Sequence, residues 1–567
     1  MKTYLSLLTG CAIFALAACA GQPTEPDEEA EPALTEEQAA QEDEAQTVDD
    51  LGRVHFDTSC SEQAQPHFER GLAQLHHMWY EKARESFEEA ASADDDCAMA
   101  YWGVAMTHYT PLWAAPSDEA LQRGAQAADR AAELAPDHER ERAFIAAIEA
   151  YYDDYEQRTT EERTASFRDG WERAYRLDPR DVEAASFYSL AILATVPPIT
   201  DSTEKQERAG LLLEDVLSRE PMHPGGHHYL IHAYDHPELA ERAVPIARRY
   251  AEIAPDVPHA LHMPSHIFTR LGLWQDNAEW NLRSADAAAE NPVDGKSSLH
   301  FYHALDYVVY AYLQQAKDEQ AAEVAERARQ ADNPQQHLVN GYASAAIPAR
   351  IALEQRDFEA AANMSSLHPD ALAWDSWPYL EAITHATRAV GAIYEDDLQK
   401  AQDELDRIEE LQAESADLNE PYWAAQADIY HDVVEGLIDY ARERPEDALA
   451  TLREAVQAQD SLQKHPASPG RIIEARDYLG EVLRSEDRPD EALEVYERSL
   501  EVTPRRFHAL YGAAIAARED GQDRVARDYY TQLLELTEDG DGDRPELREA
   551  REYVDDAIAA STEEAAE

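Results

Sequence analysis

The sequence predicts an all-α protein, built as an α-solenoid in which antiparallel helical hairpins stack into a superhelix. Apolar residues recur every three or four positions along most of the 567 residues, and no segment shows the strict alternation of a half-buried strand. Residues also recur at an interval of 34, since His228 and His232 are followed by His262 and His266. An interval of this length holds two helices, and units that repeat in this way stack on their neighbours.

The N-terminal segment is expected to direct export and to lie outside the fold. Lys2 precedes a short, mainly apolar run that ends in Leu16-Ala17-Ala18-Cys19, so residues 1–18 are predicted to be a signal peptide. The Leu-Ala-Ala-Cys sequence resembles the lipobox of bacterial lipoproteins, which implies cleavage before Cys19 and acylation of that residue. The resemblance implies an exported lipoprotein of the outer membrane, facing the periplasm or the cell surface. A secreted protein with an incidental cysteine is the alternative.

Residues 19–52 are expected to form a disordered tether that begins at the lipidated Cys19. They are rich in Asp, Glu and Pro and contain no Lys or Arg. Such a segment buries too little apolar surface to offset the entropy lost on ordering. The protein would then contact the membrane through its lipid anchor only.

The net charge of the chain limits the kinds of partner that we expect. It carries 115 Asp and Glu against 49 Lys and Arg, a formal net charge of -66. Nucleic acid and anionic lipid are therefore not expected as partners, because both repel such a surface. The acidic residues are spread along the whole chain, which favours a salt-adapted, halophilic type of surface over a local acidic binding patch.

Two of the four cysteines are expected to pair. Cys60 lies just before the first predicted helix and Cys97 just after the second, so the two are neighbours at one end of an antiparallel hairpin. An exported protein reaches an oxidising compartment, where a disulfide persists. Two free thiols are the alternative.

The clearest repeats lie near the C-terminus, where small and aromatic residues recur at fixed positions. Ala492 is followed four residues later by Tyr496, and Ala526 by Tyr530, at an offset of 34. These positions resemble the tetratricopeptide repeat (TPR) family, and the resemblance covers most of residues 60–535. It implies that the first helices of the hairpins line a concave groove that binds a protein, a peptide or a small ligand.

The expected organisation has two blocks of repeats. Residues 53–345 form a TPR-like solenoid with a His-rich pocket, residues 346–560 form further TPR repeats, and residues 561–567 form a disordered tail. The register within residues 320–400 stays open. The phrases HHYLIHAYDHPELA and PHALHMPSHIFTRLGLW also resemble His-rich bacterial TPR lipoproteins whose activity is not established, so that resemblance implies no mechanism.

The histidines of the chain are concentrated in one stretch. Ten of the 22 lie between His223 and Asp306, and helical spacing places them in stripes on successive first helices. The metal ligands expected on these facing stripes are His228, His232, Asp235, His262, His266, His303 and Asp306. The ligand-binding residues expected around them are His236, His259, His300, Arg270 and Trp102.

Histidine with aspartate, and no thiolate, is a ligand set for a divalent transition metal such as Zn, Fe, Mn, Ni or Cu. Three other interpretations stay open: a metal-free polar groove that binds a peptide, histidines buried for structural reasons, and a pH-sensing cluster. The sequence therefore predicts an extracytoplasmic binding or assembly module with a His- and Asp-lined, metal-binding groove. A metal-dependent enzyme, in particular a hydrolase, is the alternative, and no catalytic residue is identified.

Overall fold

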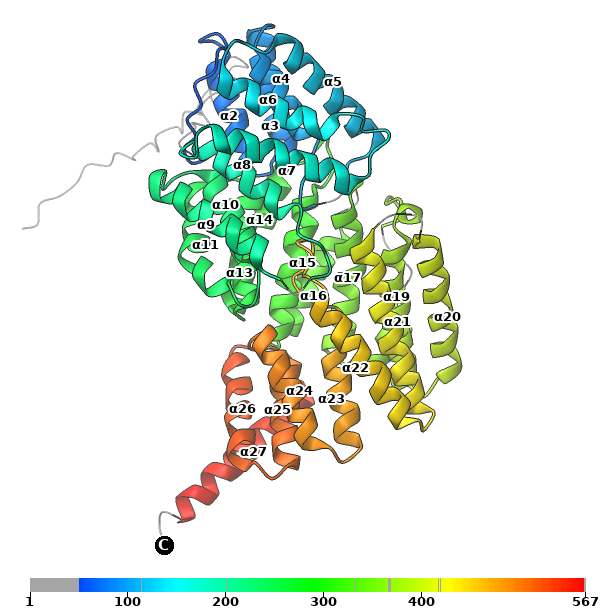
Figure 1. Cartoon of the computed structure of the whole chain (residues 1–567). Coiled ribbons are helices and arrows are strands. Elements are labelled where there is room, and N and C mark those ends of the chain that lie inside the picture. The colour runs from blue at the N-terminus through cyan, green and yellow to red at the C-terminus, as the bar shows by residue number, and fades with distance from the viewer. Residues whose placement is uncertain are drawn as a thin grey trace, which may run out of the picture. The chain divides into compact units, whose positions relative to one another are not determined.

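The computed structural model describes most of the chain as helices. The described residues are 50–564, with a few internal exceptions, which are Ala114, Asp201, Asp332, residues 366–368, Asp417 and Asn419. Over this range the chain forms helices and isolated bridges without a strand, which confirms the all-α prediction (Figure 1). The predicted signal peptide, Cys19 and the tether up to residue 49 lie outside the described residues, as do residues 565–567.

Consecutive helices pair as antiparallel hairpins from the first described helix onward. The helices before the histidine-rich region and its first hairpin are α2 (Gln65–His76), α3 (Tyr80–Ala93), α4 (Ala98–Thr107), α5 (Asp118–Leu134), α6 (Glu139–Tyr152), α7 (Thr160–Leu177), α8 (Val182–Leu193), α9 (Glu204–Arg219), α10 (Pro224–Tyr234) and α11 (Ala240–Ile253). The middle of the chain contains α12 (Pro258–His262), α13 (Pro264–Arg270), α14 (Trp274–Glu290), α15 (Leu299–Gln314), α16 (Asp318–Arg329), α17 (Leu338–Glu354) and α18 (Phe358–Ala362).

The C-terminal part continues the same pattern. It contains the short 3-10 helix η1 (Trp374–Ser376), then α19 (Pro378–Tyr394), α20 (Leu398–Ser415), α21 (Pro421–Ala441), α22 (Pro445–Ser461), α23 (Ala475–Ser485), α24 (Pro489–Val502), α25 (Phe507–Glu519), α26 (Asp523–Leu536) and α27 (Pro545–Glu564). Helix α27 extends beyond residue 560, where a disordered tail was expected to begin. The chain is thus a TPR-type α-solenoid of stacked hairpins, as predicted.

The small residues of the repeats lie where helices approach most closely. A Cβ atom added to Gly71 would lie 2.9 Å from Cδ1 of Phe87, on the second helix of the same hairpin. Gly480 and Gly512 both lie against the ring of Tyr496, which packs between the first helices of two successive hairpins. A larger side chain would separate the helices, so these positions explain the repeat pattern in the sequence.

Two expected boundaries differ in the structure. The boundary between residues 345 and 346 falls inside α17, and residues 48–567 form one compact unit. The tether also ends before Gly52, because the side chain of Leu51 is buried and its carbonyl accepts a hydrogen bond from His77 Nε2 at 3.0 Å. Cys60 and Cys97 are joined by a disulfide, with their Cα atoms 4.8 Å apart.

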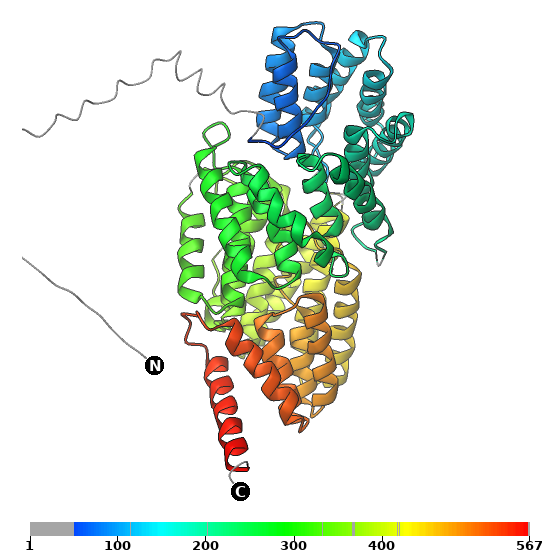
Figure 2. The same cartoon turned by 90° about the vertical axis from the view of Figure 1, so that its left-hand side faces the viewer.

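The C-terminal hairpins return to the middle of the chain (Figure 2). The indole of Trp274 donates to the carbonyl of Arg505 at 2.8 Å, and the amide of Phe507 donates to Gln314 at 3.0 Å. Arg544, before α27, pairs with Asp318 at 2.6 Å. These contacts close α25–α27 onto α14–α16, so the stack completes a turn instead of staying open.

The loop of residues 462–474, between α22 and α23, lies inside this turn. Ser468 accepts from Tyr307 through its carbonyl at 3.0 Å, and its hydroxyl is 2.6 Å from that of Tyr342. Leu462 forms an isolated bridge with Ile199. The 462–474 loop therefore connects parts of the chain that are far apart in sequence, and it covers the histidine-rich helices.

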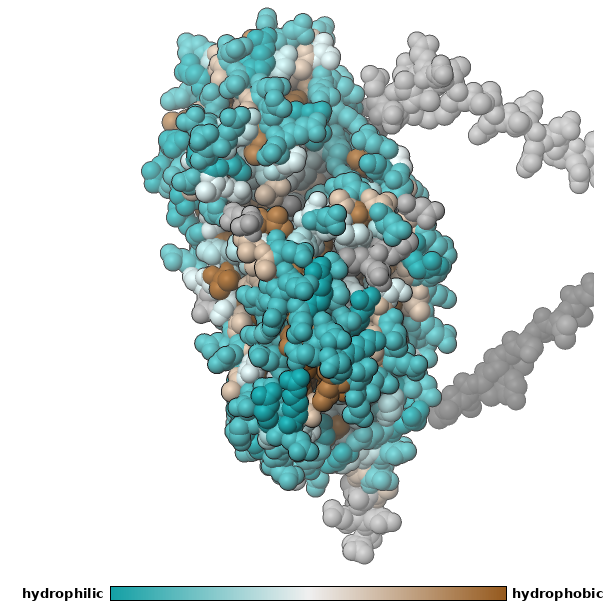
Figure 3. Space-filling model, turned by 90° about the vertical axis from the view of Figure 1, so that its right-hand side faces the viewer, coloured by the Kyte–Doolittle hydropathy of each residue, from teal (hydrophilic) through white to brown (hydrophobic). Residues whose placement is uncertain are grey.

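The outer surface is mostly hydrophilic, with apolar side chains scattered singly over the face shown in Figure 3. Among the described residues, none of the helices combines the length and the hydropathy required to cross a membrane.

Candidate metal centre

Seven histidines from neighbouring helices meet in one array beneath the 462–474 loop. Six have side chains at most 6% exposed, and His232 is partly buried. The array consists of His228 and His232 on α10, His259 and His262 on α12, His266 on α13, and His300 and His303 on α15. Pro264 lacks an N–H and divides the first helix of its hairpin into α12 and α13, which sets the directions of His262 and His266 separately.

Three of these rings converge at what we name the A site, formed by His262, His266 and His303. Each offers one nitrogen, and the three nitrogens lie within 4.8 Å of one another. The Nε2 atoms of His262 and His266 are 2.9 Å apart, and the ring centroids of His262 and His303 are 4.1 Å apart. The predicted stripes of one hairpin and of the following helix thus meet at this site.

Hydrogen bonds to the outer nitrogens set the tautomers at the A site. Nδ1 of His262 donates to Oδ1 of Asn281 at 2.6 Å, because the amide nitrogen of Asn281 already donates to Asn277. Nδ1 of His266 donates to the Asp235 carboxylate at 2.8 Å, since a lone pair could not face that carboxylate. In neutral rings both Nε2 atoms then carry lone pairs, and these point at each other across 2.9 Å.

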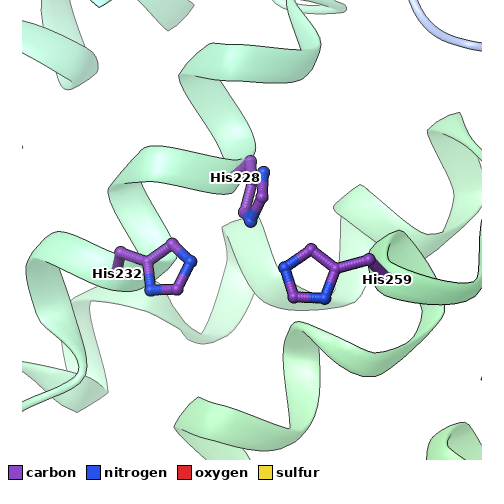
Figure 4. Close-up of side chains that lie close together, drawn as sticks. All are labelled: His228, His232 and His259. Atoms are coloured by element: carbon purple, nitrogen blue, oxygen red, sulfur yellow. The ribbon is translucent and has the colours of Figure 1, made fainter. Parts of the chain in front are cut away.

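A second group, which we name the B site, contains His228, His232 and His259. Their nitrogens also lie within 4.8 Å of one another, and Figure 4 shows the three rings turned toward a common point. Nδ1 of His228 donates to the carbonyl of His76 at 2.6 Å, so its Nε2 carries a lone pair. That Nε2, Nε2 of His232 and both nitrogens of His259 have no hydrogen-bond partner among the described residues. Each orphaned buried group costs about 1–3 kcal/mol.

Asp235 orients the array from its edge. Its carboxylate lies 2.8 Å from His266, 2.8 Å from Arg270 and 2.9 Å from Lys464. Burial alone would raise the pKa of Asp235, but the charges of Lys464 and Arg270 outweigh burial and hold this pKa well below its usual value. The carboxylate is therefore ionised, and it fixes the His266 ring in the manner of an outer-shell partner of a metal ligand. Arg270 is occupied by this ion pair.

The histidines themselves are neutral at neutral pH. Burial lowers the pKa of His232 to about 3 and that of His266 to about 4. Burial is the main reason why the pKa values of His259 and His262 lie well below their ordinary value, and the neighbouring histidine rings lower them further. Neutral imidazole is the form that ligates a metal, so the array needs no deprotonation before it binds one.

Two residues expected at the site lie elsewhere. Asp306 is fully buried but turns away from the histidines and pairs with Arg350 at 2.8 Å, because residue 306 lies beyond the stripe that reaches the A site. Trp102 is fully buried in an aromatic core, where its indole donates to the carbonyl of Phe144 at 3.2 Å. Neither residue lines a groove.

The two remaining histidines expected around the site lie at its margins. His236 is half-buried just after α10, and its Nδ1 accepts from the amide of Glu238 at 3.3 Å. The His300 ring is 5.2 Å from that of His259, and its Nδ1 has no partner in the described part of the chain.

Loop residues complete the site, and helical spacing did not reveal them. The ring of Trp113 is 5.0 Å from that of His259 and 5.8 Å from that of His303. Lys464 comes from the 462–474 loop, and its Nζ lies 3.4 Å from Nδ1 of His266, which is 198 residues earlier in the chain. Only the closure of the stack determines which helices those loops cover.

A cavity of about 320 Å³ lies next to the array. Its walls come from the loop after α4, from the segment after α8, from residues 420–423 at the start of α21 and from residues 463–466. His232 and Asp235 form part of its lining, whereas the A-site histidines do not. The concave groove expected from the repeat pattern is therefore narrowed to this cavity, and the one B-site histidine in its wall is His232.

A third buried group has a different character. His76 and His223 donate to the two oxygens of Glu183 at 2.7 and 3.2 Å. Their other nitrogens accept from Tyr229 at 3.1 Å and from Gly226 at 3.0 Å. Every polar atom of this triad has a partner, so we interpret it as a structural network.

Comparisons with known proteins add only a likeness in fold. No protein-family model matches the chain, and no curated protein matches it. The human IFIT1 dimer with PPP-AAAA is 12% identical, over 86% of this chain and 99% of IFIT1, with a TM-score of 0.37. YrrB, a TPR protein with an unusual peptide-binding site, is 16% identical, over 35% of this chain and 90% of YrrB, with a TM-score of 0.20. At these values the likeness carries no inference about function, and the TPR-type α-solenoid rests on the structure of the chain itself.

Proposed function

We propose that this protein is a binding module that holds a divalent transition metal ion at the A site, beside a pocket for a small ligand or a peptide segment. His262, His266 and His303 would supply the nitrogens. Asn281 and Asp235 would hold the first two rings from behind. Three imidazoles suit Zn, Fe, Mn, Ni or Cu and do not choose among them.

The observation that carries the proposal is the contact between Nε2 of His262 and Nε2 of His266 at 2.9 Å. Both Nδ1 atoms already donate, so both inner nitrogens carry lone pairs in the neutral rings. Two lone pairs at this distance repel each other unless a cation or an added proton lies between them. A proton is disfavoured here, because burial lowers the pKa of both rings, and the charge of Lys464 lowers that of His266 further.

The proposed partner is a ligand that enters the cavity of about 320 Å³. This volume suits a small molecule or a few side chains of a peptide, and it lies within the range of ligand pockets. The lipobox-like sequence before Cys19 supports a place for this module on the outer membrane, held by lipid and facing the periplasm or the cell surface.

A metal-dependent hydrolase is a second candidate function. The observation that favours it is the number of nitrogens, since three protein ligands leave a coordination position for water, as in catalytic zinc sites. Steady hydrolysis of an activated ester or phosphoester by the metal-loaded protein, abolished by chelation, would support this candidate over a pure binding role.

Elemental analysis of tag-free protein, purified without chelator and dialysed against metal-free buffer, tests the proposal. The parent should retain a transition metal, and a His262→Ala/His266→Ala variant should lose the A-site ion. His431→Ala is the control, because His431, Asp432 and Glu435 form a separate cluster on α21 whose loss should leave the A-site ion in place. A parent without bound metal, even after incubation with Zn²⁺ or Co²⁺, would refute the proposal.

A further inference from the structure

We infer that the histidine array is a two-ion centre, in which the B site holds a second metal ion that carries the exchangeable position for an anionic ligand. The inference rests on the proposed function, and it adds a second site, a division of roles between the two ions and a class of ligand. Its first support is the convergence of three nitrogens at His228, His232 and His259, separate from those of the A site.

The B site meets the requirements of a metal site independently of the A site. His228 is held by the carbonyl of His76 at 2.6 Å, which directs its Nε2 inward. The inward nitrogens of His228 and His232, and both of His259, lack hydrogen-bond partners over the described range. Buried polar atoms are almost always paired, so several unpaired nitrogens that face one point are typical of a cation-binding site.

The two sites lie side by side but are distinct. The ring centroids of His232 and His266 are 5.7 Å apart, as are those of His259 and His262. No histidine is shared between the two groups. Ions bound at both sites would thus be neighbours, each with three imidazoles of its own.

Access differs between the two sites. His232 and Asp235 form part of the cavity wall, and His232 is the one member of the six that is not fully buried. The A-site rings are at most 2% exposed and do not line that cavity. An ion at the B site would therefore face the cavity, whereas an ion at the A site would be enclosed.

Charge determines the class of ligand. Two divalent ions bound by neutral imidazoles would bring four positive charges into a region that also holds Lys464 and Arg270. The carboxylates that oppose them are Asp235, which already pairs with Arg270 and Lys464, and Glu420 at the cavity wall. Asp306 is already neutralised by Arg350. Buried charge needs compensation, so the open position at the B site favours an anion, such as a carboxylate or a phosphate group.

Cobalt substitution tests both parts of the inference. Metal-free parent protein is titrated with Co²⁺, bound cobalt is counted after desalting, and azide serves as the anionic probe while the visible spectrum is recorded. The parent should bind two Co²⁺ ions per chain, and azide should change the spectrum. The His228→Ala/His259→Ala variant should bind one and lose the azide response. The His262→Ala/His266→Ala variant should bind one and keep that response.

The outcomes separate this inference from the proposed function. One ion in the parent, lost only from the A-site variant, would overturn the second site and leave the proposed function standing. No ion in the parent would overturn both. An azide response that survives in the B-site variant would overturn the division of roles. Far-UV circular dichroism checks folding, and His232→Ala, at the cavity wall, replaces the double variant if that one does not fold.

Discussion

Two groups of buried histidines lie close together in this molecule, and they differ in their hydrogen bonds. In the triad of His76, Glu183 and His223, every ring nitrogen and both carboxylate oxygens have partners. In the array that begins at His228, buried nitrogens lack partners in the described residues or face one another. Both groups contain buried histidines, so the burial of a histidine does not by itself separate structure from function. What separates the two groups is the number of ring nitrogens and carboxylate oxygens that have a hydrogen-bond partner.

The difference also appears in the charges. Burial alone would raise the pKa of Glu183, but His223 and His76 outweigh it and keep this carboxylate ionised. The triad therefore carries its own anion and needs nothing more. The A and B sites contain six neutral rings, and the nearest carboxylate, Asp235, is already shared by Lys464 and Arg270. The array has ring nitrogens whose lone pairs are available to a cation, whereas the ring nitrogens of the triad are all in hydrogen bonds.

The largest effect is expected from a substitution that breaks the triad. His223→Ala leaves one oxygen of the Glu183 carboxylate buried without its partner, and such a loss costs about 3–5 kcal/mol. Denaturant unfolding of the metal-free variant should show this decrease in stability. In a separate measurement, the metal-loaded variant should bind as many ions per chain as the parent. His259→Ala is the matched variant in the array. This substitution should reduce the stability of metal-free protein far less, because His259 has no hydrogen-bond partner to lose among the described residues. Equal losses of stability in the two variants would contradict the difference between the triad and the array.

The next effect concerns metal removal. An ion that binds only the folded array stabilises the protein by about 2.7 kcal/mol when free metal is 100 times its dissociation constant. Adding a chelator should therefore lower the melting temperature of the parent. The His262→Ala/His266→Ala variant should show a smaller shift. The same shift in both proteins would mean that the A site does not carry the stabilisation.

Acid should weaken the fold through neutral histidines outside the array. Burial lowers the pKa of His77 to about 3, so the unfolded chain takes up a proton at this residue before the folded chain does. Stability is then constant above about pH 6.5 and decreases as pH falls, by about 2 kcal/mol at pH 5 for this residue. Unfolding of metal-free parent and His77→Phe between pH 7 and pH 5 measures the difference. Parallel pH profiles would contradict this assignment.

The smallest effect is expected at the edge of the array. Asp235→Asn keeps an acceptor for Nδ1 of His266 but removes the charge, and outer-shell changes weaken metal affinity by about 10–100-fold. We expect the lower end, about tenfold, in a competition titration with a chromophoric chelator. Asp306→Asn serves as comparison, because Asp306 pairs with Arg350 away from the rings and should leave the affinity unchanged.

Local periodicity predicted much of the site, because helical spacing determines which side chains share a face. His228 with His232, and His262 with His266, lie together for this reason. Asp306 shows the limit, since a residue three positions after His303 turned to a buried arginine that comes from another helix. Nothing local could place Lys464, which reaches the histidines only because the stack closes on itself. The cavity beside the array follows from that closure.

The central claim is that a cation lies between two imidazole nitrogens of the A site. A crystal of tag-free protein grown with Zn²⁺, measured on both sides of the zinc absorption edge, tests it most directly. The account predicts an anomalous peak at about 2.0–2.1 Å from Nε2 of His262 and from Nε2 of His266. The absence of such a peak, with the two Nε2 atoms still 2.9 Å apart and joined by a shared proton, would contradict it.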